Sequence, residues 1–180
     1  LPLTQEQVTM EGWAIEARVY AEDPFRGFLP SIGRLTRYEP PLDVDGIRVD
    51  DGVEEGSEIS MFYDPMIAKL VAYGETRDAA ADRMGEALNR YRIRGVGHNI
   101  PFLSATIAMD RFRKGNITTN FIAEEFPDGF EGAAIGDYER GAMQALAVAF
   151  SRDDAERNLR ISGQVANRGK SEIATFWTVR

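Results

Sequence analysis

Arg18 is the charged residue whose setting in this sequence is best suited to chemistry, because a strand would fix the direction of its side chain. Residues 12–21 alternate between apolar and polar side chains, which is the period of a strand with one buried face. Arg18 shares the polar face with Glu16, and the Pro- and Gly-rich segment 21–33 could shape a cleft beside them. The two residues could equally form a surface or interface ion pair with no chemical purpose. Spacing by itself therefore does not name a reaction.

The single histidine, His98, could act as a general base, since imidazole titrates near neutral pH. It stands between a glycine-containing loop and a predicted helix start, with no identifiable partner to orient it, so we expect a structural or surface role. The chain has no cysteine, which removes disulfides, thiolate nucleophiles and Cys-ligated zinc, and one histidine makes a His-rich metal site implausible. Glycine-rich phosphate loops, HExxH pairs and GxSxG elbows are also absent from the sequence.

The composition of the 180 residues, 43% hydrophobic and 28% charged, predicts a folded chain with a sizeable core. A formal net charge of -8 would repel phosphate backbones, so we expect no nucleic-acid partner. Residues 50–58 are rich in carboxylates but lack the ligand order of an EF-hand, so they predict a solvated acidic loop and not a calcium site.

The location of the protein is predicted from what the sequence lacks. No apolar run approaches the ~20 residues that cross a bilayer, and the N-terminus has neither the basic start nor the apolar middle of a secretion signal. We therefore expect a cytoplasmic protein with no membrane partner. Because the sequence begins at Leu1 and not at Met, it could be a fragment or a processed product.

The elements that would position Arg18 are a mixture of strands and helices. Residues 66–73 are almost continuously apolar, as expected of a strand covered on both faces. Asp45 and Gly46 predict a hairpin-type turn into extended residues 47–49. A helix should run from Thr76, a favourable N-cap, to about residue 92. The other predicted elements are a short strand near 34–38, helices at 99–113, 119–125 and 137–153, and a strand pair divided by 167–169.

Together these elements predict an α+β fold: an antiparallel sheet with packed helices, followed by a helix and a partial β unit. The segment 127–136 is the predicted boundary, because its turn formers interrupt the periodic pattern. We therefore expect a first domain over residues 1–126, a linker over 127–136, and a second, incomplete unit over 137–180.

Several segments of this chain are similar to one known family. Residues 12–33, GWAIEARVYAEDPFRGFLPSIG, resemble the signature that opens the C-terminal subdomain of biotin carboxylases. The segments YDPMIAKLVAYGETRDAA, RIRGVGHNIPFL and GNITTNFI are similar to the same family in the same order, so the resemblance covers residues 1 to about 126. FPDGFEG and the helix beyond it look like the α subunits of propionyl-CoA carboxylases, in which this linker enters a subunit-contact domain.

The resemblance implies a ligase that uses ATP to activate bicarbonate, through carboxyphosphate, and transfers the carboxyl group to a ureido nitrogen of biotin. Arg18 occupies the position that resembles the family's biotin-binding arginine. There a guanidinium would stabilise the enolate-like oxygen formed when the nitrogen loses its proton, so Arg18 is the predicted catalytic residue. Phe121 falls where the family places an apolar side chain against the adenine of ATP, although core packing would explain it equally well.

The resemblance also bears on assembly. The counterparts of Asp45, Arg48 and Asp64 lie near the homodimer contact of single-enzyme members, where an aromatic residue is expected at the first position. A carboxylate would weaken that contact because desolvating an unpaired charge is costly, so we predict that this subunit does not use the bacterial-type homodimer. Arg48 and Asp64 could instead form local ion pairs. The expected partners are bicarbonate and biotin as substrates, and a carboxyltransferase β subunit.

The cofactors implied are biotin, ATP and Mg2+, but the ATP lid, the magnesium-binding carboxylates, the general base and the biotin-carrying lysine are not recognisable in these residues. The fragment is therefore expected to be inactive alone. Its expected compartment is the cytoplasm, or the mitochondrial matrix in a eukaryote. Two alternatives stay open: a biotin carboxylase of an acetyl-CoA, methylcrotonyl-CoA or pyruvate system, and a non-catalytic interaction module with the same fold.

Overall fold

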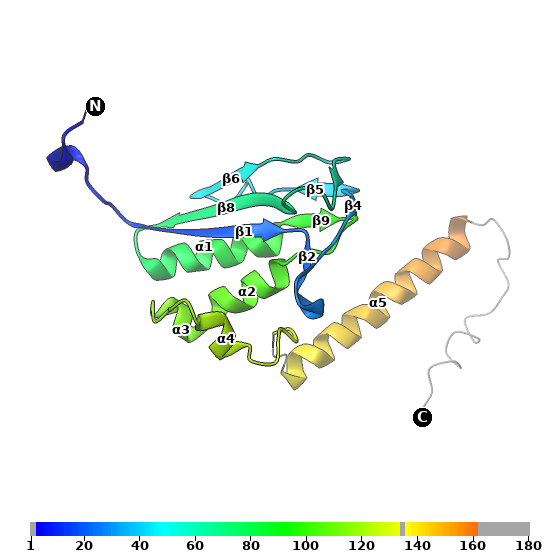
Figure 1. Ribbon diagram of the computed structural model, residues 1–180. Coiled ribbons are helices and arrows are strands. Elements are labelled where there is room, and N and C mark those ends of the chain that lie inside the picture. Colours follow the sequence, from blue (N-terminus) through cyan, green and yellow to red (C-terminus); the bar gives the residue numbers. More distant parts are fainter. Residues whose placement is uncertain (1–2, 134–135, 162–180) are drawn as a thin grey trace. The chain divides into compact units, whose positions relative to one another are not determined.

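Three antiparallel strands in the order β1–β8–β6 form the central sheet (Figure 1). The computed structural model describes residues 3–133 and 136–161. β1 spans Trp13–Tyr20, β8 spans Met66–Gly74, and β6 spans Ile47–Asp51. Each strand lies where the sequence predicts one. Since β8 is in the middle, β1 and β6 each leave one edge without a partner strand in this sheet.

The inner face of the sheet packs against α1, which spans Arg77–Arg90 and lies beside the strands in Figure 1. The alternation of β1 directs Ile15, Ala17 and Val19 to this side, where all three are buried. Burial of apolar area at roughly 25 cal/mol per Å2 makes this layer the main source of stability. The other core residues of these two elements and β8 are Ile67, Ala68, Leu70, Ala72, Ala80, Ala81, Met84, Ala87 and Leu88.

The outer face of the same sheet carries charge. Its polar side chains come from all three strands: Glu16, Arg18, Arg48, Asp50 and Lys69. The expectation that residues 66–73 are covered on both faces is wrong for the described residues, because Tyr73 on the outer face is 44% exposed. The continuous apolar run had a different cause: both faces of β8 carry apolar residues, but α1 covers only one of them.

Helix α1 begins and ends where local chemistry dictates. The side chain of Thr76 accepts a hydrogen bond from the backbone N–H of Ala79 at 3.1 Å, which confirms the predicted N-cap. Asp78 lies in the first turn, where the helix dipole favours negative charge. Tyr91 then adopts extended backbone, so the helix ends at Arg90, two residues before the predicted end.

Three short strand pairs surround the central sheet. β2 (Glu22–Asp23) pairs with β3 (Leu29–Pro30), and the 3-10 turn η2 (Pro24–Arg26) connects them. A second 3-10 turn, η1 (Gln5–Gln7), precedes β1. The bounds of the other two pairs are Gly33–Arg34 for β4 with Glu58–Ile59 for β7, and Arg37–Glu39 for β5 with Arg92–Arg94 for β9. The strand predicted near 34–38 is therefore two strands with different partners, which no local pattern could separate.

The turn at Gly46 is real, but it does not close a hairpin. Gly46 has φ +75°, and an added Cβ would lie 3.1 Å from the carbonyl oxygen of Tyr73, so the position favours glycine. The strand that follows, β6, pairs with β8 and not with the strand before the turn. The hairpin expectation is thus wrong, because tertiary pairing overrides a local turn signal.

Three helices follow β9: α2 (Ile100–Ala108), α3 (Asp110–Arg113) and α4 (Phe121–Glu125). The single helix predicted over 99–113 is interrupted at Met109, whose ψ of 134° is extended. The short helix predicted at 119–125 begins two residues later, at Phe121.

An aromatic cluster fastens the chain that follows α4 onto this unit. The ring of Phe102 on α2 lies 4.9 Å from Phe28, 5.3 Å from Phe126 and 5.5 Å from Phe130, measured between centroids. Phe25 lies 5.1 Å from Phe130, whose side chain is buried. Phe130 belongs to the predicted linker, yet it packs as part of the first unit.

The chain divides into two units between Ala133 and Ala134, inside the predicted linker 127–136. In the second unit α5 spans Asp137–Ile161, so the predicted helix is present and longer than expected. The predicted strand pair around 167–169 lies outside the described residues. Over the ranges that the structure describes, no helix is both long and apolar enough to cross a bilayer.

Candidate functional site

Arg18 projects from β1 on the outer face of the sheet, as the alternation predicts. Its side chain is 60% exposed, and its Nε lies 3.3 Å from Oε1 of Glu16 on the same strand. The hydrogen bond with Glu16, followed by that with Tyr20, raises the pKa of the Arg18 guanidinium, which stays cationic at any physiological pH. The site therefore presents a permanent, accessible cation on a paired strand.

Lys69 stands directly opposite Arg18 in the antiparallel register of β1 and β8. The carbonyl of Arg18 bonds toward the free edge of β1, so the two residues form a non-hydrogen-bonded pair, in which side chains are closest. Among the described residues Lys69 forms no ion pair, although Asp50 lies opposite it on β6. Two cations facing each other are destabilising unless negative charge joins them, so this place suits an anionic oxygen.

The backbone next to Arg18 is irregular. Val19 pairs with Ala68 but Tyr20 pairs with Met66, so one residue of β8 bulges. Bulges re-aim side chains and are common beside functional sites. Asn99 contacts β1 at this point through its side chain, a role that sequence reasoning missed, because Asn99 and Arg18 lie 81 positions apart and share no local pattern.

Two carboxylates lie near the end of β1. Burial, followed by repulsion from Asp64, raises the pKa of Glu22. One Asp64 oxygen accepts a hydrogen bond from the backbone N–H of Met66 at 3.0 Å, which anchors the start of β8. Asp64 therefore shapes the loop before β8 and pairs with no cation in the described part of the chain.

The other two positions predicted near a homodimer contact lie around β6. Asp45 is exposed in the turn that precedes this strand. Arg48 Nε lies 3.2 Å from Asp50 Oδ1, so the alternative of a local ion pair fits Arg48. Arg48 lies on the same outer face as Arg18.

Phe121 is not brought together with Arg18. Its side chain is buried, with its ring centroid 6.4 Å from that of Phe112 and 5.1 Å from the guanidinium carbon of Arg111. Arg111 in turn forms ion pairs with Glu124 and with Glu125, the latter at 2.9 Å. This helix lies on the α1 side of the sheet (Figure 1), whereas Arg18 faces away from α1. Core packing thus accounts for Phe121 within this unit, and contact with adenine stays a prediction.

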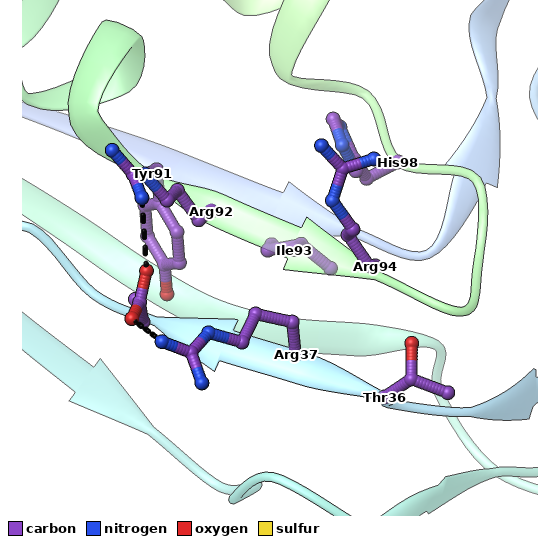
Figure 2. A pocket seen from close by; sticks show the side chains of 8 residues that line it. Thr36, Arg37, Tyr91, Arg92, Ile93, Arg94 and His98 are labelled. Atoms are coloured by element: carbon purple, nitrogen blue, oxygen red, sulfur yellow. Dashed lines mark hydrogen bonds and ion pairs between the residues drawn. The ribbon is translucent and has the colours of Figure 1, made fainter. Parts of the chain in front are cut away.

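A hollow of about 570 Å3 lies beside the β5–β9 pair (Figure 2). Glu39 pairs with Arg37 and, at 3.7 Å, with Arg92, so one carboxylate neutralises two arginines at its edge. The residues that line the hollow are Thr36, Arg37, Glu39, Tyr91, Arg92, Ile93, Arg94 and His98. Arg18 and Phe121 are not among them, so the hollow does not extend the predicted site.

His98 has the structural setting that the sequence predicts. Burial lowers the pKa of its imidazole, and its buried Nδ1 has no hydrogen-bond partner in the described residues. A general base needs a group that orients it, so this geometry gives no support for catalysis by His98.

Tyr38 and Tyr91 form a polar junction at the rim of the core. Their hydroxyl oxygens lie 2.7 Å apart, and the Tyr38 hydroxyl also donates to Asp51 at 3.0 Å. Burial raises the pKa of Tyr91 to about 12 and also raises the pKa of Tyr38. The pair therefore stays protonated near neutral pH and ties β5 to the end of α1 and to β6.

Within residues 3–133 and 136–161 no group of three or more His, Asp or Glu side chains could hold a metal ion.

Comparison with known proteins gives a family match over most of the first unit. The model of the family described as "Biotin carboxylase C-terminal domain" matches residues 16–124. The propionyl-CoA carboxylase alpha chain of Caenorhabditis elegans, named mitochondrial, is 49% identical over 180 residues, which cover 98% of this chain and 24% of that protein. The propionyl-CoA carboxylase alpha chain of Ruegeria pomeroyi is 46% identical over 198 residues, covering 99% of this chain and 29% of the relative.

A solved structure has the same fold. The biotin carboxylase domain of Hydrogenobacter thermophilus 2-oxoglutarate carboxylase, crystallised with MgADP, ADP and bicarbonate, matches with a TM-score of 0.67 and 42% identity, over 69% of this chain and 27% of that one. The chain thus spans about a quarter of the length of the proteins it matches.

Proposed function

The chain belongs to the biotin carboxylase C-terminal domain family, and from this premise we propose that it supplies the biotin-binding arginine of an ATP-dependent biotin carboxylase. Arg18 is that residue. The observation that carries the proposal is its geometry: an exposed guanidinium on a paired strand, oriented by Glu16 and facing Lys69 across the sheet.

The chemistry asked of Arg18 is electrostatic. ATP, when bound, activates bicarbonate for transfer of its carboxyl group to a ureido nitrogen of biotin. As that nitrogen loses its proton, negative charge grows on the ureido oxygen, and a fixed cationic donor favours this charge more than it favours neutral biotin. Glu16 holds the guanidinium through Nε, so N–H groups on the terminal nitrogens remain that can donate to that oxygen. Lys69 adds positive potential on the same face.

The test compares two exposed arginines of the same sheet face in the complete subunit. Arg18→Ala should lower biotin- and bicarbonate-dependent ATP cleavage by roughly 100- to 1,000-fold, the usual cost of a lost charge-stabilising donor. Arg18→Lys should restore little, since an ammonium lacks the planar fork. Arg48→Ala is the matched control, because Arg48 is also exposed and also pairs with a carboxylate two residues away, Asp50, and it should leave the rate unchanged. Equal rates for Arg18→Ala and Arg48→Ala would refute the assignment.

We propose propionyl-CoA as the final acceptor and a carboxyltransferase β subunit as the partner. The support is that the two propionyl-CoA carboxylase relatives match 98% and 99% of this chain, including the part beyond the family model. ATP and Mg2+ would bind mainly through other parts of the protein. The proposed compartment is the cytoplasm, or the mitochondrial matrix in a eukaryote.

Acceptor and assembly are tested on the complete enzyme. The mass of the complex with its carboxyltransferase partner, together with relative rates on propionyl-CoA, acetyl-CoA and methylcrotonyl-CoA, decides between the acyl-CoA systems. We also propose that the bacterial-type homodimer is absent, since Asp45 places an exposed carboxylate where that contact expects an aromatic side chain. A biotin carboxylase dimer that persists without the partner subunit would contradict this.

A further inference from the structure

The side chain of Asn99, the residue immediately before α2, lies at the free edge of β1. Its Nδ2 donates to the carbonyl oxygen of Arg18 at 3.1 Å, and its Oδ1 accepts from the backbone N–H of Tyr20 at 2.9 Å. Its own backbone N–H donates to the carbonyl oxygen of Tyr20 at 3.1 Å. Three hydrogen bonds therefore hold the two residues on either side of Val19.

The side-chain amide of Asn99 takes the place of a peptide group from a neighbouring strand. A carboxamide carries an N–H donor and a carbonyl acceptor side by side, so it can pair with the backbone of an edge strand where no neighbouring strand is present. β8 holds the opposite edge of β1, and the register shift lies at the same place. Arg18 thus stands on backbone that is held from both sides beside a bulge, by β8 on one edge and by Asn99 on the other.

The side chain of Asn99 does not cap the helix that follows it. It precedes α2 as its N-cap residue, yet its side chain makes no capping hydrogen bond, although asparagine is among the best residues for that task. Asn99 is buried, with 5% of its surface exposed. Because this buried amide bonds to β1 and makes no capping hydrogen bond to α2, we conclude that its structural role is to hold the strand.

We propose that Asn99 is a positioning residue for Arg18, which fixes the backbone from which the guanidinium is aimed. The effect of Asn99 on catalysis rests on the proposed function of Arg18. The hydrogen bonds by which Asn99 holds β1 do not depend on that function and are tested by a separate measurement. Without the Asn99 side chain the Arg18–Tyr20 backbone would lose two of these three hydrogen bonds and keep only the one from the Asn99 backbone N–H, so the guanidinium would sample more directions. Since misplacement of a catalytic group by about 1 Å can cost a hundredfold, the expected loss of rate is roughly tenfold to a hundredfold.

The first measurement is hydrogen exchange in the complete subunit, followed by mass spectrometry of a peptide that contains Arg18–Tyr20. Asn99→Ala should speed exchange of the Tyr20 amide by roughly tenfold, because that amide loses its acceptor. The control is Thr106→Ala on the same helix, whose hydroxyl is buried without a hydrogen-bond partner in the described residues and which should leave this peptide unchanged. Unchanged exchange in Asn99→Ala would overturn the grip on β1.

The second measurement is a double-mutant cycle on biotin-dependent ATP cleavage, with Asn99→Ala and Arg18→Ala alone and together. If Asn99 acts through Arg18, its removal lowers the rate in the parent enzyme and changes nothing further once Arg18 is alanine. A merely structural role would lower the rate by the same factor in both backgrounds and would overturn the inference. Asn99→Asp keeps the acceptor for Tyr20 and removes the donor for Arg18, so it provides a second variant should Asn99→Ala fail to fold.

The two proposals fail in different ways. If Arg18→Ala leaves the rate unchanged, the function proposed for Arg18 is wrong and the catalytic part of this inference falls with it, while the exchange measurement still decides whether Asn99 holds β1. If Arg18→Ala lowers the rate but the cycle is additive, Arg18 keeps its function and only the positioning role of Asn99 is refuted.

Discussion

The two faces of the β1–β8–β6 sheet use alternate residues of the same strands for different ends. On the inner face Ile15, Ala17 and Val19 are buried against α1, whereas on the outer face Glu16 and Arg18 are exposed. Packing of the inner side chains holds the strand backbone in place, and this backbone fixes where the outer side chains start. The comparison teaches that the direction of a surface arginine is fixed by its immediate neighbours in sequence, because those neighbours are packed in a core.

The largest expected effect is a difference in the free energy of unfolding between substitutions on the inner face and on the outer face. Leu70→Ala on β8 removes a fully buried side chain and should lower the free energy of unfolding by about 2–5 kcal/mol. Its sequence neighbour Val71, half-buried on the outer face, is the control, and Val71→Ala should cost clearly less. Urea unfolding of the chain, followed by circular dichroism, measures both. Equal losses would show that the faces do not differ in this way.

A smaller loss of stability is expected at the polar junction formed by Tyr38 and Tyr91 at the rim of the core. Tyr91→Phe removes the hydroxyl bonded to Tyr38 and should cost about 1 kcal/mol near neutral pH. The pKa of Tyr91 is raised to about 12 in the folded protein, against about 10 for an unfolded tyrosine. Its contribution is therefore complete below pH ~10 and is lost as the pH rises toward ~12.

Unfolding measured at pH 9 and at pH 11 tests the sign. The parent chain should lose more stability between these values than Tyr91→Phe, which has no phenol to ionise there. The variant should still lose some stability at alkaline pH, because the pKa of Tyr38 is raised as well. A steeper alkaline loss in Tyr91→Phe would contradict the assignment.

The smallest expected effect belongs to the outer face. Lys69→Met removes the cation opposite Arg18, so the urea midpoint should stay the same or rise slightly, because like charges face each other across the pair. The rate of biotin-dependent ATP cleavage in the complete subunit should fall by roughly fivefold, the effect of one screened unit charge at close range. High salt should narrow that difference. A drop in stability with an unchanged rate would assign Lys69 to the fold instead.

Much of the local structure could be predicted because its causes are local. The alternation in 12–21 predicted both β1 and the outward direction of Arg18, and Thr76 predicted the start of α1 through its cap. The family resemblance was also legible in the order of short segments, and the family match over residues 16–124 confirms it. In each case a few adjacent residues contain all the information that the inference needs.

Pairing between distant segments was decided by the tertiary structure. Nothing near Gly46 says that β6 will pair with β8, and nothing near Met109 announced a break in the helix predicted over 99–113. Asn99 suggested only a helix start, and its amide instead bonds to β1. Sequence periodicity reports which way a side chain faces along its own strand or helix. Which backbone lies across from it depends on how the whole chain closes on itself, and that is visible only once the elements are packed.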